Sequence, residues 1–95
     1  MYRPTANEVK VLKALRELGE ADGRTVGSKI GMGSEMADYL CRYLITKELV
    51  HRAGRRYALT AAGETALEEA FSRVLSILRD REHDMIETMS KLRFI

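Results

Sequence analysis

Residues 25–59 carry the pattern that most constrains the fold, because helical and strand-like segments follow one another there with sharp turns between them. Gly31 and Gly33 are so close that they predict a tight turn, with Met32 between them filling the core from the corner. Strand-forming residues on both sides of Gly54 predict a short hairpin. The predicted order is therefore helix, turn, helix and hairpin.

Helical periodicity defines the two helices of this segment. The first begins near Arg24 or Thr25 and ends at Ile30, and Gly27 inside it weakens the helix by about 1 kcal/mol relative to alanine. The second runs over residues 34–47. Its inward face consists of residues at helical spacing, namely Ala37, Leu40, Cys41 and Leu44.

Another helix precedes this segment. Thr5 and Glu8, three residues apart, form the capping box typical of a helix start, and Gly19 is a typical helix end. Residues 21–23 then predict a turn. Together these patterns predict a mainly α fold with a small β-hairpin.

The last part of the chain predicts a long helix over residues 61–93, capped by Thr60. Such a helix would be about 50 Å long, which a domain this small cannot cover. Its apolar residues follow the spacing of a coiled-coil seam, but six polar residues at 79–84 interrupt it, so one continuous helix and a helix–loop–helix both remain open. We expect a dimer interface made of Leu67, Phe71, Val74, Leu78, Met85, Met89 and Leu92. The alternative is that this helix folds back on its own domain.

The sequence offers little for catalysis or metal binding. Cys41 is the only cysteine, so no intrachain disulfide forms, and together with His51 and His83 it provides too few ligands for a zinc cluster. No nucleophile elbow or phosphate-binding loop occurs. We therefore expect neither an enzyme nor a cofactor. Cys41 is interpreted as a small buried hydrophobic residue, with a redox sensor as the alternative.

The segment from Ile30 to Val50 resembles the helix-turn-helix of winged-helix regulators, in which an apolar residue and a glycine close the second helix. The residues that match this pattern in order are Ile30, Gly31, Met32, Leu44, Leu49 and Val50. Residues 57–63, with Leu59–Thr60 followed by Gly63, are similar to the strand-to-helix junction of multiple-antibiotic-resistance-type and phenolic-acid-type repressors. Over residues 8–70 the nearest overall likeness is to small archaeal winged-helix DNA-binding proteins with a C-terminal antiparallel coiled coil.

This resemblance implies a winged helix-turn-helix DNA-binding domain at residues 1–60 and a coiled-coil dimerisation helix at 61–95. The recognition helix would be 34–47, and the wing would be the basic loop at 51–56. The implied DNA-contacting residues are Ser34, Met36, Tyr39, Arg42, Tyr43, Arg52, Arg55 and Arg56. The short loop is expected to project its three arginines together.

Several of these assignments have alternatives. A tyrosine of the recognition helix can instead pack on the N-terminal segment or on a partner subunit. Glu35 and Asp38 repel phosphates and are interpreted as solvated acids near a helix N-terminus. Met36 stands where a small hydroxyl residue often contacts DNA in this family, and Glu48 replaces the usual glycine after the recognition helix.

Charge supports a nucleic-acid partner through its distribution rather than its total. The net charge is only +2, but residues 1–60 hold 11 Lys or Arg against 7 Asp or Glu, whereas residues 61–95 hold 5 against 7. No apolar run reaches the roughly 20 residues of a membrane span, and no signal-peptide pattern occurs, so a cytoplasmic protein is expected. The sequence predicts a homodimeric transcriptional regulator that binds double-stranded DNA. A protein–protein docking module and a non-specific architectural DNA-binding protein remain as alternatives.

Overall fold

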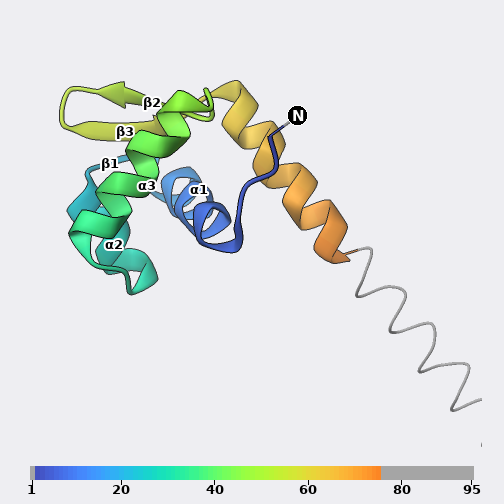
Figure 1. The fold of residues 1–95 in the computed structure, drawn as a ribbon, viewed down its shortest axis with the longest axis horizontal. Helices are drawn as coiled ribbons and strands as arrows, with labels where there is room; N and C mark the ends of the chain where they lie inside the picture. Colours follow the sequence, from blue (N-terminus) through green and yellow to red (C-terminus); the bar gives the residue numbers. More distant parts are fainter. Residues whose placement is uncertain (1, 76–95) are drawn as a thin grey trace, which may run out of the picture.

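A computed structural model of the chain describes residues 2–75. Three helices and a small sheet appear in the predicted order, and residues 61–75 are helical (Figure 1). The elements are α1 (Ala6–Leu18), β1 (Glu20–Ala21), α2 (Gly23–Ile30), α3 (Ser34–Thr46), β2 (Val50–Ala53) and β3 (Arg56–Leu59). Figure 1 shows hairpin β2–β3 projecting at one end, with α2 beneath it and the helical residues 61–75 leaving on the opposite side. The predicted mainly α fold with a small β-hairpin is confirmed.

The predicted capping box starts α1. Thr5 Oγ1 accepts a hydrogen bond from Glu8 N at 3.3 Å, and the Glu8 carboxylate accepts one from Thr5 N at 2.9 Å. Glu8 is only 2% exposed, and its carboxylate also accepts a hydrogen bond from the Tyr2 hydroxyl at 2.8 Å. A buried carboxylate needs such donors, so the N-terminal segment is held against α1. Gly19 ends the helix at φ +81°, as its position predicted.

The turn predicted at residues 21–23 is wrong. Ala21 instead belongs to β1, which pairs antiparallel with β3 and completes a three-stranded sheet in the order β1-β3-β2. Asp22 is the N-cap of α2, accepting a hydrogen bond from Thr25 N at 2.7 Å, and Gly23 is the first helical residue. A two-residue strand is too short to show the alternation of apolar and polar residues that predicts strands. Only its pairing with β3 defines it.

The turn between α2 and α3 depends on two glycines. Gly31 has φ +67° in the predicted tight turn, and Met32 packs against the core as expected. A Cβ added at Gly27 would lie 2.5 Å from the Met32 carbonyl oxygen. Gly27 therefore permits the backbone of the turn to approach α2, which is a role that helix propensity alone does not reveal.

One hydrophobic core joins the three helices to the sheet and to residues 61–75. Its fully buried members include Val11, Leu12, Leu15, Val26, Ala37, Cys41, Leu44, Val50, Tyr57 and Leu67. Thr60 caps the helical residues 61–75, since its hydroxyl accepts from Gly63 N at 3.0 Å and donates to the Glu48 carbonyl at 2.7 Å. None of the helices in the described part of the chain has the length and apolar content that crossing a bilayer requires.

Part of the predicted dimer interface belongs to the protomer core. Leu67 is 0% exposed within a single chain and has no surface to offer a partner, so its assignment to the interface is corrected. Phe71 is half-buried, with the Arg16 guanidinium 5.1 Å from its ring centroid, whereas Val74 is 54% exposed. Outside the described residues lie Leu78, Met85, Met89 and Leu92, together with the choice between one continuous helix and a helix–loop–helix.

Cys41 is fully buried, which confirms its interpretation as a small core residue. Burial, with a further contribution from the nearby Asp38 carboxylate, raises the pKa of the Cys41 thiol to about 12. The reactive thiolate is therefore scarce at neutral pH. We expect native protein to resist alkylation by iodoacetamide at pH 7.5 and to react once urea unfolds it. Rapid alkylation of the native chain, measured by mass spectrometry, would contradict this packing.

Candidate nucleic-acid interface

The outer side of α3 presents an unusual set of exposed residues. Met36 is 53% exposed and Tyr39 is 58% exposed, although both are large and partly apolar. Ser34, Glu35 and Arg42 are exposed on the same helix. Large apolar groups left in water on one helix face are typical of a contact surface. The sequence-based choice of these residues for contact with a partner therefore agrees with their exposure.

Tyr43 differs from the other residues predicted on α3. Its ring meets that of Tyr2 edge-on, with the centroids 6.2 Å apart, and the Lys47 ammonium lies 5.5 Å from the Tyr43 centroid and 5.0 Å from that of Tyr2. Such aromatic and cation–π contacts stabilise the N-terminal segment. The alternative in which a tyrosine packs on that segment therefore describes Tyr43.

The hairpin reverses in two residues, Gly54 and Arg55, with Gly54 at φ +64° and Ala53 paired with Arg56. Residues paired across two strands share a face of the sheet, and successive residues alternate. Because Arg52 pairs with Tyr57, it lies on the face that carries the buried Tyr57 ring, and its guanidinium is 5.6 Å from that ring's centroid.

The same register places Arg56 on the other face of the hairpin. Its positive charge there contributes to lowering the pKa of the Asp22 carboxyl, after the larger effect of the hydrogen bond from Thr25. The expectation that all three arginines project together is therefore corrected. Arg52 and Arg55 border a common hollow, whereas Arg56 is not among the residues that line it.

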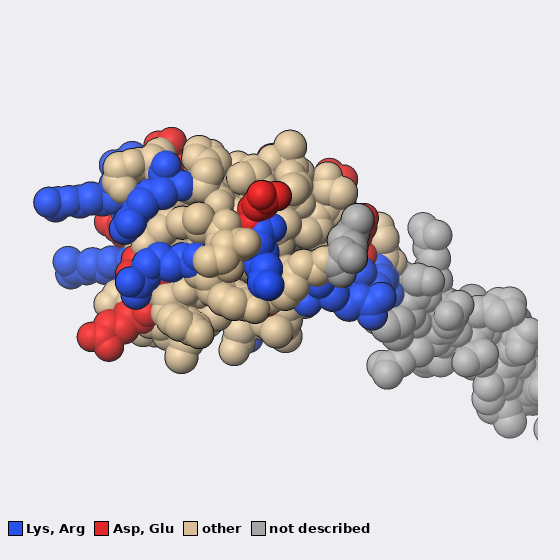
Figure 2. Space-filling model, turned by 45° about the horizontal axis from the view of Figure 1, so that its top comes forward, with Lys and Arg blue, Asp and Glu red and all other residues tan. Residues whose placement is uncertain are grey.

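That hollow is open, has a volume of about 400 Å³, and lies between the hairpin, the start of α2 and the start of α3. Its basic residues are Arg24, Arg52 and Arg55, among which Arg24 was missed because no local pattern connects it to the hairpin. Figure 2 shows Lys and Arg side chains gathered at this end of the molecule, with Asp and Glu between them. The hollow is lined by Asp22, Gly23, Arg24, Ser34, Glu35, Asp38, Arg52 and Arg55.

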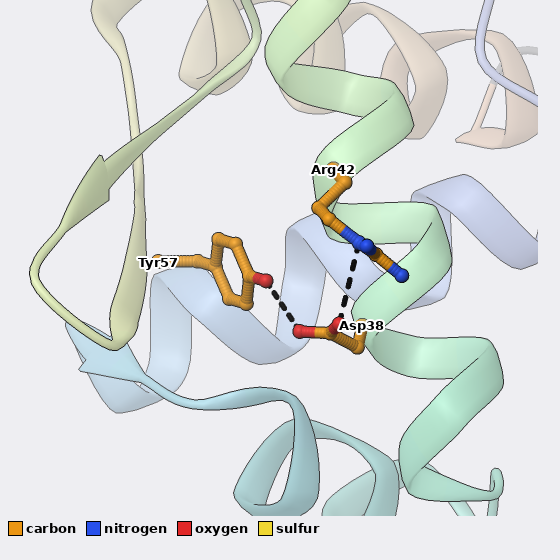
Figure 3. Close-up of polar contacts among 3 residues, drawn as sticks. All are labelled: Asp38, Arg42 and Tyr57. Atoms are coloured by element: carbon orange, nitrogen blue, oxygen red, sulfur yellow. Dashed lines mark hydrogen bonds and ion pairs between the residues drawn. The ribbon is translucent and has the colours of Figure 1, made fainter.

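Asp38 is partly solvated, as the sequence suggested, since its side chain is 39% exposed, but its carboxylate also has two partners within the chain. The Tyr57 hydroxyl donates a hydrogen bond to Asp38 Oδ1, and Arg42 Nε lies 3.3 Å from Asp38 Oδ2 (Figure 3). Burial, and then the hydrogen bond that the hydroxyl donates to the Asp38 carboxylate, raises the pKa of Tyr57 to about 12. The hydroxyl therefore stays protonated, and able to donate, at every pH below that value.

The three-dimensional arrangement is similar to that of several solved regulators. A MarR family protein from Bacillus stearothermophilus has a TM-score of 0.75 at 22% identity, over 83% of this chain and 59% of that chain. BpsR from Bordetella bronchiseptica, whose DNA binding is described as regulated by 6-hydroxynicotinic acid, has a TM-score of 0.69 at 22% identity, over 81% and 59%. The PcaV transcriptional regulator from Streptomyces coelicolor, solved with its natural ligand, has a TM-score of 0.66 at 21% identity, over 95% and 74%.

These similarities confirm that the chain has the winged helix-turn-helix fold of MarR-type regulators, as its resemblance implied. The chain spans 59% of the length of the Bacillus stearothermophilus protein and of BpsR. No family model matches the sequence, and no curated protein matches it. At identities of 21–22% the likeness concerns the fold.

Proposed function

We propose that this chain, with its MarR-type winged-helix fold, is a DNA-binding transcriptional regulator. The observation that carries the proposal is the hollow in which Arg52 and Arg55 of the hairpin meet the start of α3. One side of the molecule thus combines a helix with exposed side chains and a loop with permanent positive charge. Those are the two parts that a winged-helix domain applies to a duplex. The solved regulators with the same fold support this assignment.

The two parts have different tasks. Met36, Tyr39 and Arg42 on the exposed side of α3 would meet base edges in the major groove, where an arginine can bind guanine and apolar groups can contact a thymine methyl. Arg52 and Arg55 would bind phosphates flanking that groove. The guanidinium group suits phosphate because it offers several N–H donors in one plane.

We further propose that the regulator is a cytoplasmic homodimer with DNA-binding residues 1–60 and a dimerisation helix over 61–95. Within the described part of that helix, Val74 and Leu75 are 54% and 55% exposed. Burying these side chains against a second copy would remove apolar surface from water. Two-fold symmetry would then favour pseudo-palindromic DNA sites.

A titration of random-sequence duplex DNA against salt concentration tests this function. We expect binding at low salt, with the logarithm of the binding constant falling linearly as the logarithm of the salt concentration rises, because Lys and Arg release counterions from phosphates. Arg52→Ala and Arg55→Ala should each reduce the salt slope by about 1. Lys13→Ala removes one exposed charge from α1, outside this surface, and should leave the slope unchanged.

The outcomes separate the candidate functions. Absence of binding at low salt, or equal effects of all three substitutions, would overturn the proposal and favour a protein–protein docking module. The exposed Glu35 and Tyr39 on α3 are the observation that keeps that second function in consideration. Given binding, selection from a random library distinguishes a specific regulator, which enriches particular sites, from an architectural protein, which does not.

A further inference from the structure

Three elements converge on Asp38. Its own helix, α3, is approached by the start of α2 so closely that a Cβ added at Gly23 would lie 2.9 Å from Asp38 Cβ. From β3, the Tyr57 hydroxyl reaches the Asp38 carboxylate, while the rest of the Tyr57 side chain is buried with the residue only 1% exposed. Asp38 also borders the hollow that contains Arg52 and Arg55. An acid that borders a surface proposed to bind phosphates repels them, so its presence there requires an explanation.

The hydrogen bond between Tyr57 and Asp38 differs in kind from the other contacts between α3 and the hairpin. Among residues 2–75 it is the only hydrogen bond that joins a side chain of α3 to a side chain of β2 or β3. Apolar packing between these elements favours proximity but has little directional preference. A hydrogen bond to a carboxylate is directional and strong, so it restricts how the hairpin sits on the helix.

We propose that Asp38 is a positioning residue that, through the Tyr57 hydroxyl, fixes the hairpin relative to α3 so that both reach one duplex. The proposal rests on the DNA-binding function proposed above and names what sets the geometry of that site. Tyr57 connects the two parts directly. Its hydroxyl binds Asp38 on α3, and its ring supports the Arg52 guanidinium on the neighbouring strand (Figure 3 shows the first contact).

The test is a double-mutant cycle on DNA binding that combines Tyr57→Phe with Arg55→Ala. Phenylalanine keeps the ring beneath Arg52 and removes only the hydroxyl. We expect Tyr57→Phe to reduce the salt slope by about 1, because the hairpin then meets the phosphates only part of the time. In the Tyr57→Phe background, the loss of DNA affinity caused by Arg55→Ala should be smaller than in the wild type by a factor of about 3 or more. A purely structural role would lower the melting temperature and leave the two effects additive.

Tyr2→Phe is the matched control. It removes a tyrosine hydroxyl that also donates to a carboxylate, that of Glu8, but from the N-terminal segment rather than from the hairpin. We expect it to lower stability, to leave the salt slope unchanged and to be additive with Arg55→Ala. If Tyr2→Phe and Arg55→Ala were coupled as strongly as Tyr57→Phe and Arg55→Ala, the coupling would reflect destabilisation in general, and the proposal would be overturned.

Asp38 variants provide a second route if Tyr57→Phe fails to fold. Asp38→Asn retains an oxygen that accepts from Tyr57, so its effect and that of Arg55→Ala should be additive. Asp38→Ala removes the acceptor, so it should reduce the cost of Arg55→Ala as Tyr57→Phe does. Wild-type protein that binds DNA, with additive effects for Tyr57→Phe or for Asp38→Ala, overturns the positioning role alone. Wild-type protein that fails to bind DNA overturns the proposed function and this inference together.

Discussion

Gly63→Ala is expected to lower the free energy of unfolding by about 3 kcal/mol, a large fraction of the stability of a small domain. A Cβ at this position would overlap the Leu49 carbonyl oxygen. That oxygen cannot move aside freely, because it accepts a hydrogen bond from Thr60 N at 3.1 Å. The substitution therefore either forces the helical residues 61–75 away from the domain or breaks the link between Leu49 and Thr60. Urea denaturation at fixed protein concentration, followed by circular dichroism, measures the loss.

Gly33→Ala is the control for this experiment. Gly33 has an ordinary φ of −61°, and an added Cβ there would meet nothing within 4 Å. The substitution should change the free energy of unfolding by no more than about 1 kcal/mol, mainly by restricting the unfolded chain. Equal stability of Gly63→Ala and the wild type would contradict the close approach of the final helix to Leu49.

The sequence predicted best where a structural signal is local. Thr5 and Glu8 form a capping box within four consecutive residues, and Gly31 provides the positive φ that a tight turn requires. The cap at Thr60 was predicted from the residues, whereas Gly63 was noted only through a family likeness, and the structure supplies its physical reason. Thr60 caps the helix, and Gly63 leaves room for a carbonyl group.

The errors arise where tertiary structure decides. Strand β1 has two residues, and only its pairing with β3 defines it. The i, i+4 spacing of Asp38 and Arg42 is visible in the sequence, but the partner that fixes Asp38, Tyr57, is 19 residues away. The alternation of side chains along a strand could have placed Arg56 and Arg52 on opposite faces, because that inference requires only the register of the hairpin. No sequence signal connects Arg24 to the hollow at the hairpin.

Leu67→Ala is the second substitution for which we expect a large effect, a loss of about 2–5 kcal/mol in the free energy of unfolding. Seven-residue spacing placed Leu67 and Val74 in one predicted seam, because spacing does not distinguish a protomer core from a coiled-coil interface. The structure separates them, with Leu67 fully buried within the chain and Val74 more than half exposed. Truncating Leu67 therefore leaves a cavity in the protomer core, whereas truncating Val74 leaves none.

Denaturation at two protein concentrations, a hundredfold apart, distinguishes these roles. The stability of an associating protein rises with concentration, because only the folded subunits bind one another. The deficit of Leu67→Ala relative to the wild type should be the same at both concentrations, since the lost contacts lie within one chain. If the proposed dimer uses this helix, Val74→Ala should instead raise the dissociation constant of the dimer in sedimentation equilibrium, while costing little stability in dilute protein. A Leu67→Ala deficit that disappears on dilution would place Leu67 between subunits and contradict its burial in the core.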